Sequence, residues 1–83
     1  MPIIVVEHRF EPPLDAAQFK PKSEKLSPCL PTFDITWVTS MLAADGSRML
    51  CVYDAPDAEV VRRAYRLAQI PFVEVWSARR FHP

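Results

Sequence analysis

The chain has 83 residues, of which 49% are hydrophobic and 24% are charged, a balance typical of folded proteins and unlike that of disordered ones. This length allows one small domain over residues 1–83 and leaves no room for a second hydrophobic core. Ten basic and ten acidic side chains give a formal net charge of zero, so we expect neither nucleic acid nor an anionic membrane as a partner.

The N-terminal run and the cysteines indicate the compartment. Glu7, His8 and Arg9 end the first apolar run well before a signal sequence or a membrane span would be complete. Two cysteines, Cys29 and Cys51, are too few for a disulfide framework, and their spacing matches no zinc-binding pair. We therefore expect reduced thiols and a soluble, cytoplasmic protein.

The first predicted strand covers residues 2–10, where a β-branched run stops at two consecutive prolines that cannot donate to a sheet. The next segment predicts a short helix from Leu14 to Lys20, capped near Asp15. Three further prolines, at positions 21, 28 and 31, predict a broken helical segment here in place of one regular helix.

A hairpin follows, with strands at 34–43 and 48–54, because both segments alternate and the only glycine, Gly46, lies in an Asp-Gly turn between them. The main helix is predicted at 56–69, opened by the segment from Asp54 to Asp57. Its predicted apolar stripe contains Val60, Val61, Ala64, Leu67 and Ala68. A last alternating segment predicts a strand at 72–79.

This order of elements predicts an α+β, ferredoxin-like βαββαβ fold. Such a fold has a four-stranded antiparallel sheet with its helices on one face, and here the first helix is expected to be broken by prolines. The first and third strands are then central, the second and fourth are edges, and one face of the sheet has no helix over it.

Alternation along the strands divides their side chains between the two faces. We assign an aliphatic set to the helix-covered core: Leu50, Val52, Val73 and Val75. The remaining set is expected on the uncovered face: Glu7, Trp37, Thr39, Met41, Met49, Cys51, Tyr53, Phe72, Glu74 and Trp76. Monomers rarely expose such an apolar patch, so we expect a homodimer through this face, with a contact that includes Trp37, Met49, Tyr53 and Trp76.

Carboxylates and a thiol in such an interface need partners. We therefore expect a site for a small ligand on this face, formed by Glu7, Trp37, Tyr53 and Glu74. A divalent transition metal is expected as readily as a small molecule, held by Glu7, His8 and Cys51, because imidazole and thiolate suit nickel or zinc better than magnesium. Alternation places His8 opposite to Glu7 unless a bulge turns it. The plainer interpretations are that the His8 imidazole is structural and that the Cys51 thiol is simply buried. The tryptophans would then be packing anchors, and Glu7 and Glu74 would form ion pairs with arginine.

Three segments resemble a known family. They are the strand ending Val5-Val6-Glu7, the segment from Trp37 to Ser40, and the run from Cys51 to Asp57 with the following Glu59-Val60-Val61-Arg62. They resemble the DUF4242 family of small bacterial proteins over most of residues 1–10 and 34–78. The proline-containing residues 12–31 depart from the regular helix of the relatives. The resemblance implies a ferredoxin-like homodimer, and nickel as a ligand, because one member of the family binds nickel.

Three functions remain open from the sequence. The first is a metal-binding or metal-responsive homodimer. The second is a cofactor-free dimeric ferredoxin-like enzyme that uses the same face, with Glu7 or Tyr53 as its acid–base group. The third is an interaction module without a ligand.

Overall fold

A computed structural model describes the backbone of residues 1–83 and all side chains except those of Ala16 and Lys22. Its four strands form one antiparallel sheet in the order β2-β3-β1-β4. The strands are β1 (Ile3–Arg9), β2 (Thr36–Leu42), β3 (Arg48–Asp54) and β4 (Glu74–Ala78). The predicted central and edge strands are therefore confirmed.

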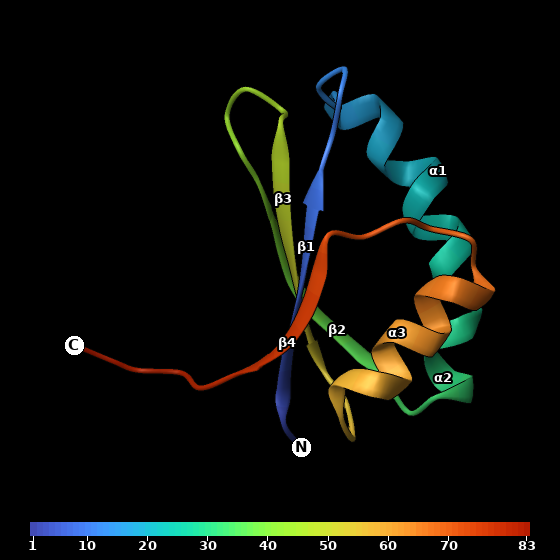
Figure 1. Cartoon of the computed structure of the whole chain (residues 1–83), viewed down its shortest axis with the longest axis vertical. Coiled ribbons are helices and arrows are strands. Elements are labelled where there is room, and N and C mark those ends of the chain that lie inside the picture. Colours follow the sequence, from blue (N-terminus) through green and yellow to red (C-terminus); the bar gives the residue numbers. More distant parts are fainter.

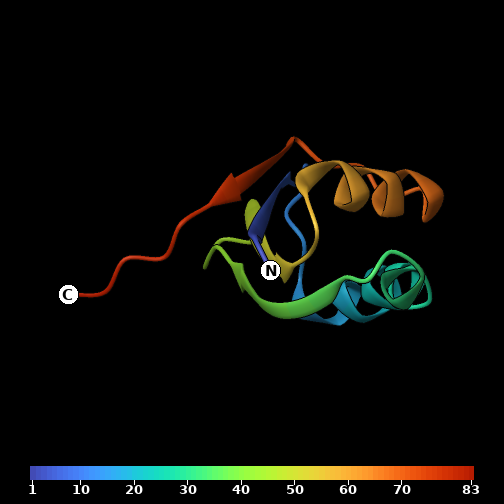
Figure 2. The same ribbon diagram turned by 90° about the horizontal axis from the view of Figure 1, so that it is seen from below.

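The helices all lie on one face of this sheet (Figures 1 and 2). They are α1 (Ala16–Leu26), α2 (Cys29–Thr32) and α3 (Ala58–Leu67). The opposite face has no helix over it, which confirms the ferredoxin-like α+β fold, and the residues after β4 run away from the body (Figure 1). Within the part of the chain that the structure describes, no helix has the length and hydropathy that a membrane crossing needs.

Helix α1 starts where the sequence predicts it and ends later. Asp15 is the N-cap and forms a capping box with Gln18. The predicted end at Lys20 is wrong, because the helix continues through Pro21 to Leu26. Pro21 lies in the middle of the helix, where it removes one backbone donor without ending the helix. The expected break falls after Leu26, before the short helix α2.

The β2–β3 hairpin has the predicted turn. Gly46 has a positive φ of 77°, a conformation that favours glycine, and its amide donates to the Ala43 carbonyl. The Asp45 carboxylate accepts from the amide and the hydroxyl of Ser47, and these bonds lower the pKa of Asp45. The Gly46 carbonyl accepts from the Leu14 amide at 2.9 Å, so the turn holds the chain that leads into α1.

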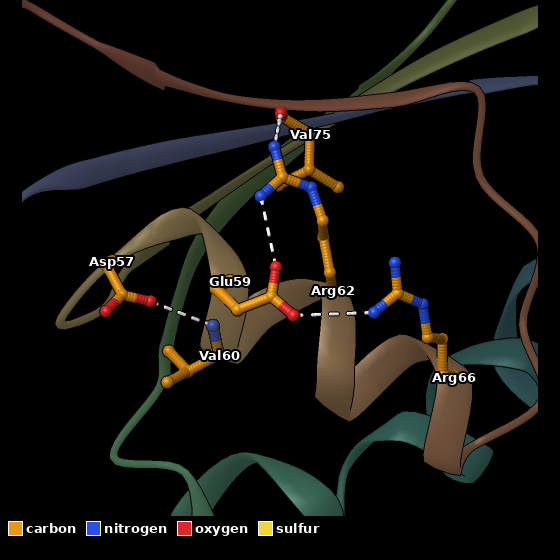
Figure 3. A network of polar contacts seen from close by, with 6 residues as sticks. All are labelled: Asp57, Glu59, Val60, Arg62, Arg66 and Val75. Carbon is orange, nitrogen blue, oxygen red and sulfur yellow. Dashed lines mark hydrogen bonds and ion pairs between the residues drawn. The ribbon is translucent and has the colours of Figure 1, made fainter.

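Helix α3 begins at Ala58, later than the predicted start, because Asp57 and not Asp54 provides the N-cap and accepts from the Val60 amide. Figure 3 shows the polar contacts that follow. The Glu59 carboxylate accepts from Arg62 and Arg66, each at 3.4 Å.

Arg62 also connects α3 to the sheet, because its guanidinium donates to the Val75 carbonyl of β4 at 2.8 Å (Figure 3). The buried side of α3 is formed by Val61, Ala64 and Tyr65. Leu67, which the predicted stripe includes, is instead exposed.

The register between β1 and β3 decides which side chains face the helices. Val6 lies opposite Cys51, and Ile4 lies opposite Tyr53. Side chains directly opposite each other share a face, and all four are buried. Cys51, Tyr53 and Met49 therefore belong to the helix-covered core, and their predicted place on the uncovered face is wrong.

The uncovered face holds the other half of each strand. Leu50 lies opposite Glu7, and Val52 lies opposite Val5, so the predicted core place of Leu50 and Val52 is also wrong. Side chains alternate within each strand as predicted. Only the pairing register determines which alternating set of β3 side chains shares a face with which set of β1 side chains. Of the two other predicted core valines, Val75 is buried and Val73 is exposed.

Candidate functional site: a cavity between the helices and the sheet

A cavity of about 360 Å³ lies between the helix-covered side of the sheet and the helices. We call it the helix–sheet cavity. The sheet contributes side chains of β1, β2 and β3: His8, Trp37, Ser40, Met49, Cys51 and Tyr53. The helices and the segment after α3 contribute mainly apolar groups: Phe19, Leu26, Leu30, Tyr65, Ile70 and Phe72. The cavity is thus mostly apolar and aromatic.

Local chain geometry explains why the cavity is open. Among the described residues, α1 makes its backbone contacts mainly with α2 and not with the strands. The helix therefore covers the cavity without filling it. The exposed residue Glu24 of α1 also lines the cavity. Arg9 lines it too, but its guanidinium pairs with Glu7 on the uncovered face.

Aromatic rings surround His8 on the cavity wall. Its ring is parallel to that of Phe10, with centroids 5.9 Å apart, and its centroid is 5.5 Å from that of Tyr65. The Tyr65 ring also meets Tyr53 and Phe72 edge-to-face. Since the Pro71 carbonyl can only accept, the His8 Nδ1 atom donates to it at 3.2 Å. His8 is therefore held by its surroundings in one orientation.

Two hydrogen-bonded groups supply the polar atoms of the wall. The Tyr53 and Tyr65 hydroxyls are 2.5 Å apart. In the second group the Trp37 Nε1 donates to Ser40 Oγ at 2.9 Å, which donates to Cys51 Sγ at 3.1 Å. The Cys51 thiol lies 3.5 Å from the Met49 sulfur.

Burial decides the protonation of these groups. It raises the pKa of the Cys51 thiol and the pKa of both tyrosines, Tyr53 and Tyr65, because the charged forms lose their hydration. All three groups are therefore protonated at neutral pH. A neutral phenol with a raised pKa is a poor general base, which disfavours the acid–base role considered for Tyr53.

The residues predicted to bind a ligand divide between two places. Trp37 and Tyr53 line the helix–sheet cavity. Glu7 and Glu74 lie directly opposite each other on β1 and β4, on the uncovered face. Glu7 also forms an ion pair with Arg9 at 3.6 Å.

The residues predicted to hold a metal are not brought together. His8 and Cys51 line the cavity, whereas Glu7 points to the other side of the sheet because it is adjacent to His8 in an unbroken strand. In the part of the chain that the structure describes, no three His, Cys, Asp or Glu side chains gather closely enough to hold a metal ion. Of the residues predicted at a dimer contact, only Trp76 lies on the uncovered face.

Sequence reasoning missed Tyr65, the partner of Tyr53. A signal was present, because Tyr65 follows Val61 by four positions and Ala64 by one, so it continues the buried side of α3. Phe19 was also missed as a wall residue. Phe72 was predicted on the uncovered face, and this is wrong, because it lines the cavity on the helix side of the sheet.

The fold and the cavity define a class: a ferredoxin-like α+β protein with an internal cavity of small-molecule size. The particular family follows from comparison with known proteins. The chain belongs to the SCO4226-like family, described as nickel responsive proteins, whose model matches residues 5–77. The nickel in this family description agrees with the nickel that the DUF4242 resemblance implied.

A solved structure supports the fold. The crystal structure of SCO4226 from Streptomyces coelicolor A3(2) is similar with a TM-score of 0.84. The likeness covers 96% of this chain and 99% of that chain at 14% sequence identity, so it extends to the fold alone. A search of the curated proteins gave no match.

Proposed function

We propose that this protein is a binding protein that takes a small, largely apolar molecule into the helix–sheet cavity. The observation that carries the proposal is the cavity of about 360 Å³ with its apolar and aromatic wall. Ligand pockets have volumes of roughly 300–1,000 Å³ and are lined mainly by apolar side chains with a few polar groups. Both properties are found here.

The energetics of packing support a function for this space. Protein interiors are close-packed, with few voids larger than a water molecule. An apolar cavity lowers stability because its wall loses contacts on one side. A ligand would restore those contacts to Phe19, Met49 and Phe72, which all face the cavity.

The test uses a neutral fluorescent probe, N-phenyl-1-naphthylamine, titrated into the full chain. We expect saturable binding at micromolar concentration. The variant Ser23→Trp places an indole on the cavity wall and should weaken binding at least tenfold. The matched control is Lys25→Trp, because this exposed residue of the same helix does not line the cavity. A wild-type protein that binds no probe, or equal binding by both variants, would overturn the proposal.

Nickel binding by a homodimer is a second candidate, and membership of a nickel-responsive family favours it. The described residues of one chain do not fit a nickel site, since no three potential ligands gather. The uncovered face offers one pair of facing carboxylates, Glu7 and Glu74. A two-fold dimer through this face would bring two such pairs near each other.

The uncovered face has the character of an interface with a second copy. Its centre is apolar, with Val5 between Val52 and Trp76 on the neighbouring strands. Carboxylates lie on the same face, at Glu7 and Glu74. An apolar centre with polar groups around it is typical of protein interfaces.

One experiment tests the nickel and dimer proposals together. We expect light scattering to give the mass of a dimer, and calorimetric titration to show nickel binding that is lost in Glu74→Gln. The matched control is Glu59→Gln, because Glu59 lies on α3, away from this face. A monomer, or nickel binding that is equal in both variants, would contradict this second candidate.

The cytoplasm is the location that we propose, because Cys29 and Cys51 are both free thiols and reduced cysteines are usual there. Fractionation of cells that express the chain at its natural level would test this.

A further inference from the structure

The wall chemistry narrows the ligand class, in an inference that rests on the proposed function. Tyr53 and Tyr65 meet hydroxyl to hydroxyl in the cavity wall. Two phenols bring two protons, and the bond between them uses one. The second proton and the remaining oxygen lone pairs can serve one further hydrogen-bonding group.

The Cys51 thiol lines the same wall and is a protein group that can take that proton. Sulfur is a weak acceptor compared with oxygen. An incoming hydroxyl can accept the tyrosine proton and donate its own to a tyrosine lone pair. It would therefore satisfy the pair better than the protein does by itself.

The wall also disfavours a charged ligand. The polar groups of the inner wall are phenol, indole, hydroxyl, thiol and imidazole. Among the described wall residues only Glu24 and Arg9 carry a charge; Glu24 is exposed, and the Arg9 guanidinium pairs with Glu7 on the uncovered face. Burying an ionised group without a partner is costly, so a carboxylate or an ammonium group is excluded from the inner wall.

Shape and size indicate a flat molecule. The rings of Tyr65, Tyr53 and Phe72 meet at interplanar angles of 79° and 84°, the edge-to-face geometry that aromatic rings favour. Phe19 and Trp37 add two further rings to the wall. A cavity of about 150 Å³ accepts a single benzene ring, so about 360 Å³ has room for a molecule of about two to three rings.

We infer that the helix–sheet cavity selects a neutral, planar aromatic molecule of about two to three rings whose hydroxyl group binds the Tyr53–Tyr65 hydroxyl pair. The aromatic wall sets the shape, and the pair sets the position of the polar group.

The experiment measures displacement of N-phenyl-1-naphthylamine at neutral pH by three competitors: 2-naphthol, 2-naphthoate and decahydro-2-naphthol. We expect 2-naphthol to bind at least tenfold more tightly than the anion and than the saturated alcohol. In Tyr65→Phe, which keeps the ring, the affinity for 2-naphthol should fall about five- to tenfold, as for one lost hydrogen bond. The affinity for the probe, which has no hydroxyl, should stay the same and report that the variant is folded.

The outcomes separate the two proposals. If the probe binds but 2-naphthoate or decahydro-2-naphthol competes as well as 2-naphthol, the inference about ligand class is wrong and the proposed function stands. The same holds if Tyr65→Phe leaves the affinity for 2-naphthol unchanged. If the probe does not bind to the wild type, the proposed function itself fails.

Discussion

Gly46 is the position at which one methyl group should matter most. Its φ of 77° costs an L-residue about 1–2 kcal/mol. A Cβ atom there would lie 2.3 Å from the Leu14 carbonyl oxygen, which is backbone and cannot rotate away. The chain must shift, and the hydrogen bond from the Leu14 amide to the Gly46 carbonyl, of about 1 kcal/mol, is then lost.

We therefore expect Gly46→Ala to lower the free energy of unfolding by about 2–3 kcal/mol. At about 0.05–0.15 kcal/mol per residue, a chain of this length has roughly 4–12 kcal/mol in total, so the change is a large share. Urea denaturation followed by Trp fluorescence measures it as a midpoint lowered by roughly 2–3 M for a urea dependence near 1 kcal/mol per M. Leu14 lines the cavity, so probe binding should weaken as well.

The control separates backbone strain from the steric clash. Gln69 also has a positive φ, 58°, at the end of α3, where Ile70 donates to the Tyr65 carbonyl in the pattern of a Schellman cap. Gln69→Gly should raise stability by about 0.5–1 kcal/mol. A Gly46→Ala variant with the wild-type midpoint would refute the reasoning about the turn.

Two further predictions concern stability. Arg62→Met should lower the free energy of unfolding by about 1–2 kcal/mol, because the part-buried hydrogen bond from the Arg62 guanidinium to the Val75 carbonyl of β4 is lost. Arg66→Met removes only an exposed ion pair and should change the free energy of unfolding by less than about 0.5 kcal/mol. Equal effects of the two variants in thermal denaturation would contradict this. Above about pH 9, near the ordinary Cys and Tyr pKa values, stability should fall, because the pKa values of Cys51, Tyr53 and Tyr65 are raised by folding and the unfolded chain loses these protons first. A urea midpoint that stays level between pH 7 and 10.5 would show that these groups are not buried as described.

Local signals predicted much of the fold. The Asp-Gly turn at Gly46, the alternation of the strands and the Asp15 cap were sufficient to place the hairpin, the sheet order and the start of α1. The ends of the helices were harder to predict, because the chain has one glycine only. Asp34 and Gln69 adopt the positive φ that ends α2 and α3, and neither residue type marks a helix end as clearly as glycine does.

The site was harder to predict than the fold, because it depends on the register between strands. Trp37 and Tyr53 were predicted to bind a ligand on the uncovered face, whereas the structure places both in the wall of the helix–sheet cavity on the other face. A shift by one position in pairing moves every side chain of β3 to the other face. Sequence reasoning judged Leu50 and Val52 more suitable for the core than Cys51 and Tyr53. The Tyr53–Tyr65 hydroxyl pair, which allows a tyrosine to be buried there, joins two elements that no local pattern connects.

Strand β2 has a consequence for how the protein behaves at high concentration. It is an outer strand of seven residues without a charge or a proline, and the unpaired backbone groups of such an edge can act as a template for another chain. The register shift between Trp37 and Thr39 leaves Val38 without an opposite residue, and this bulge interrupts the template. The other edge is protected differently, by Glu74 within β4. Val38 therefore opposes association of β2 with the sheet edge of another molecule. Deletion of Val38 would increase aggregation at high concentration more than it would destabilise the fold.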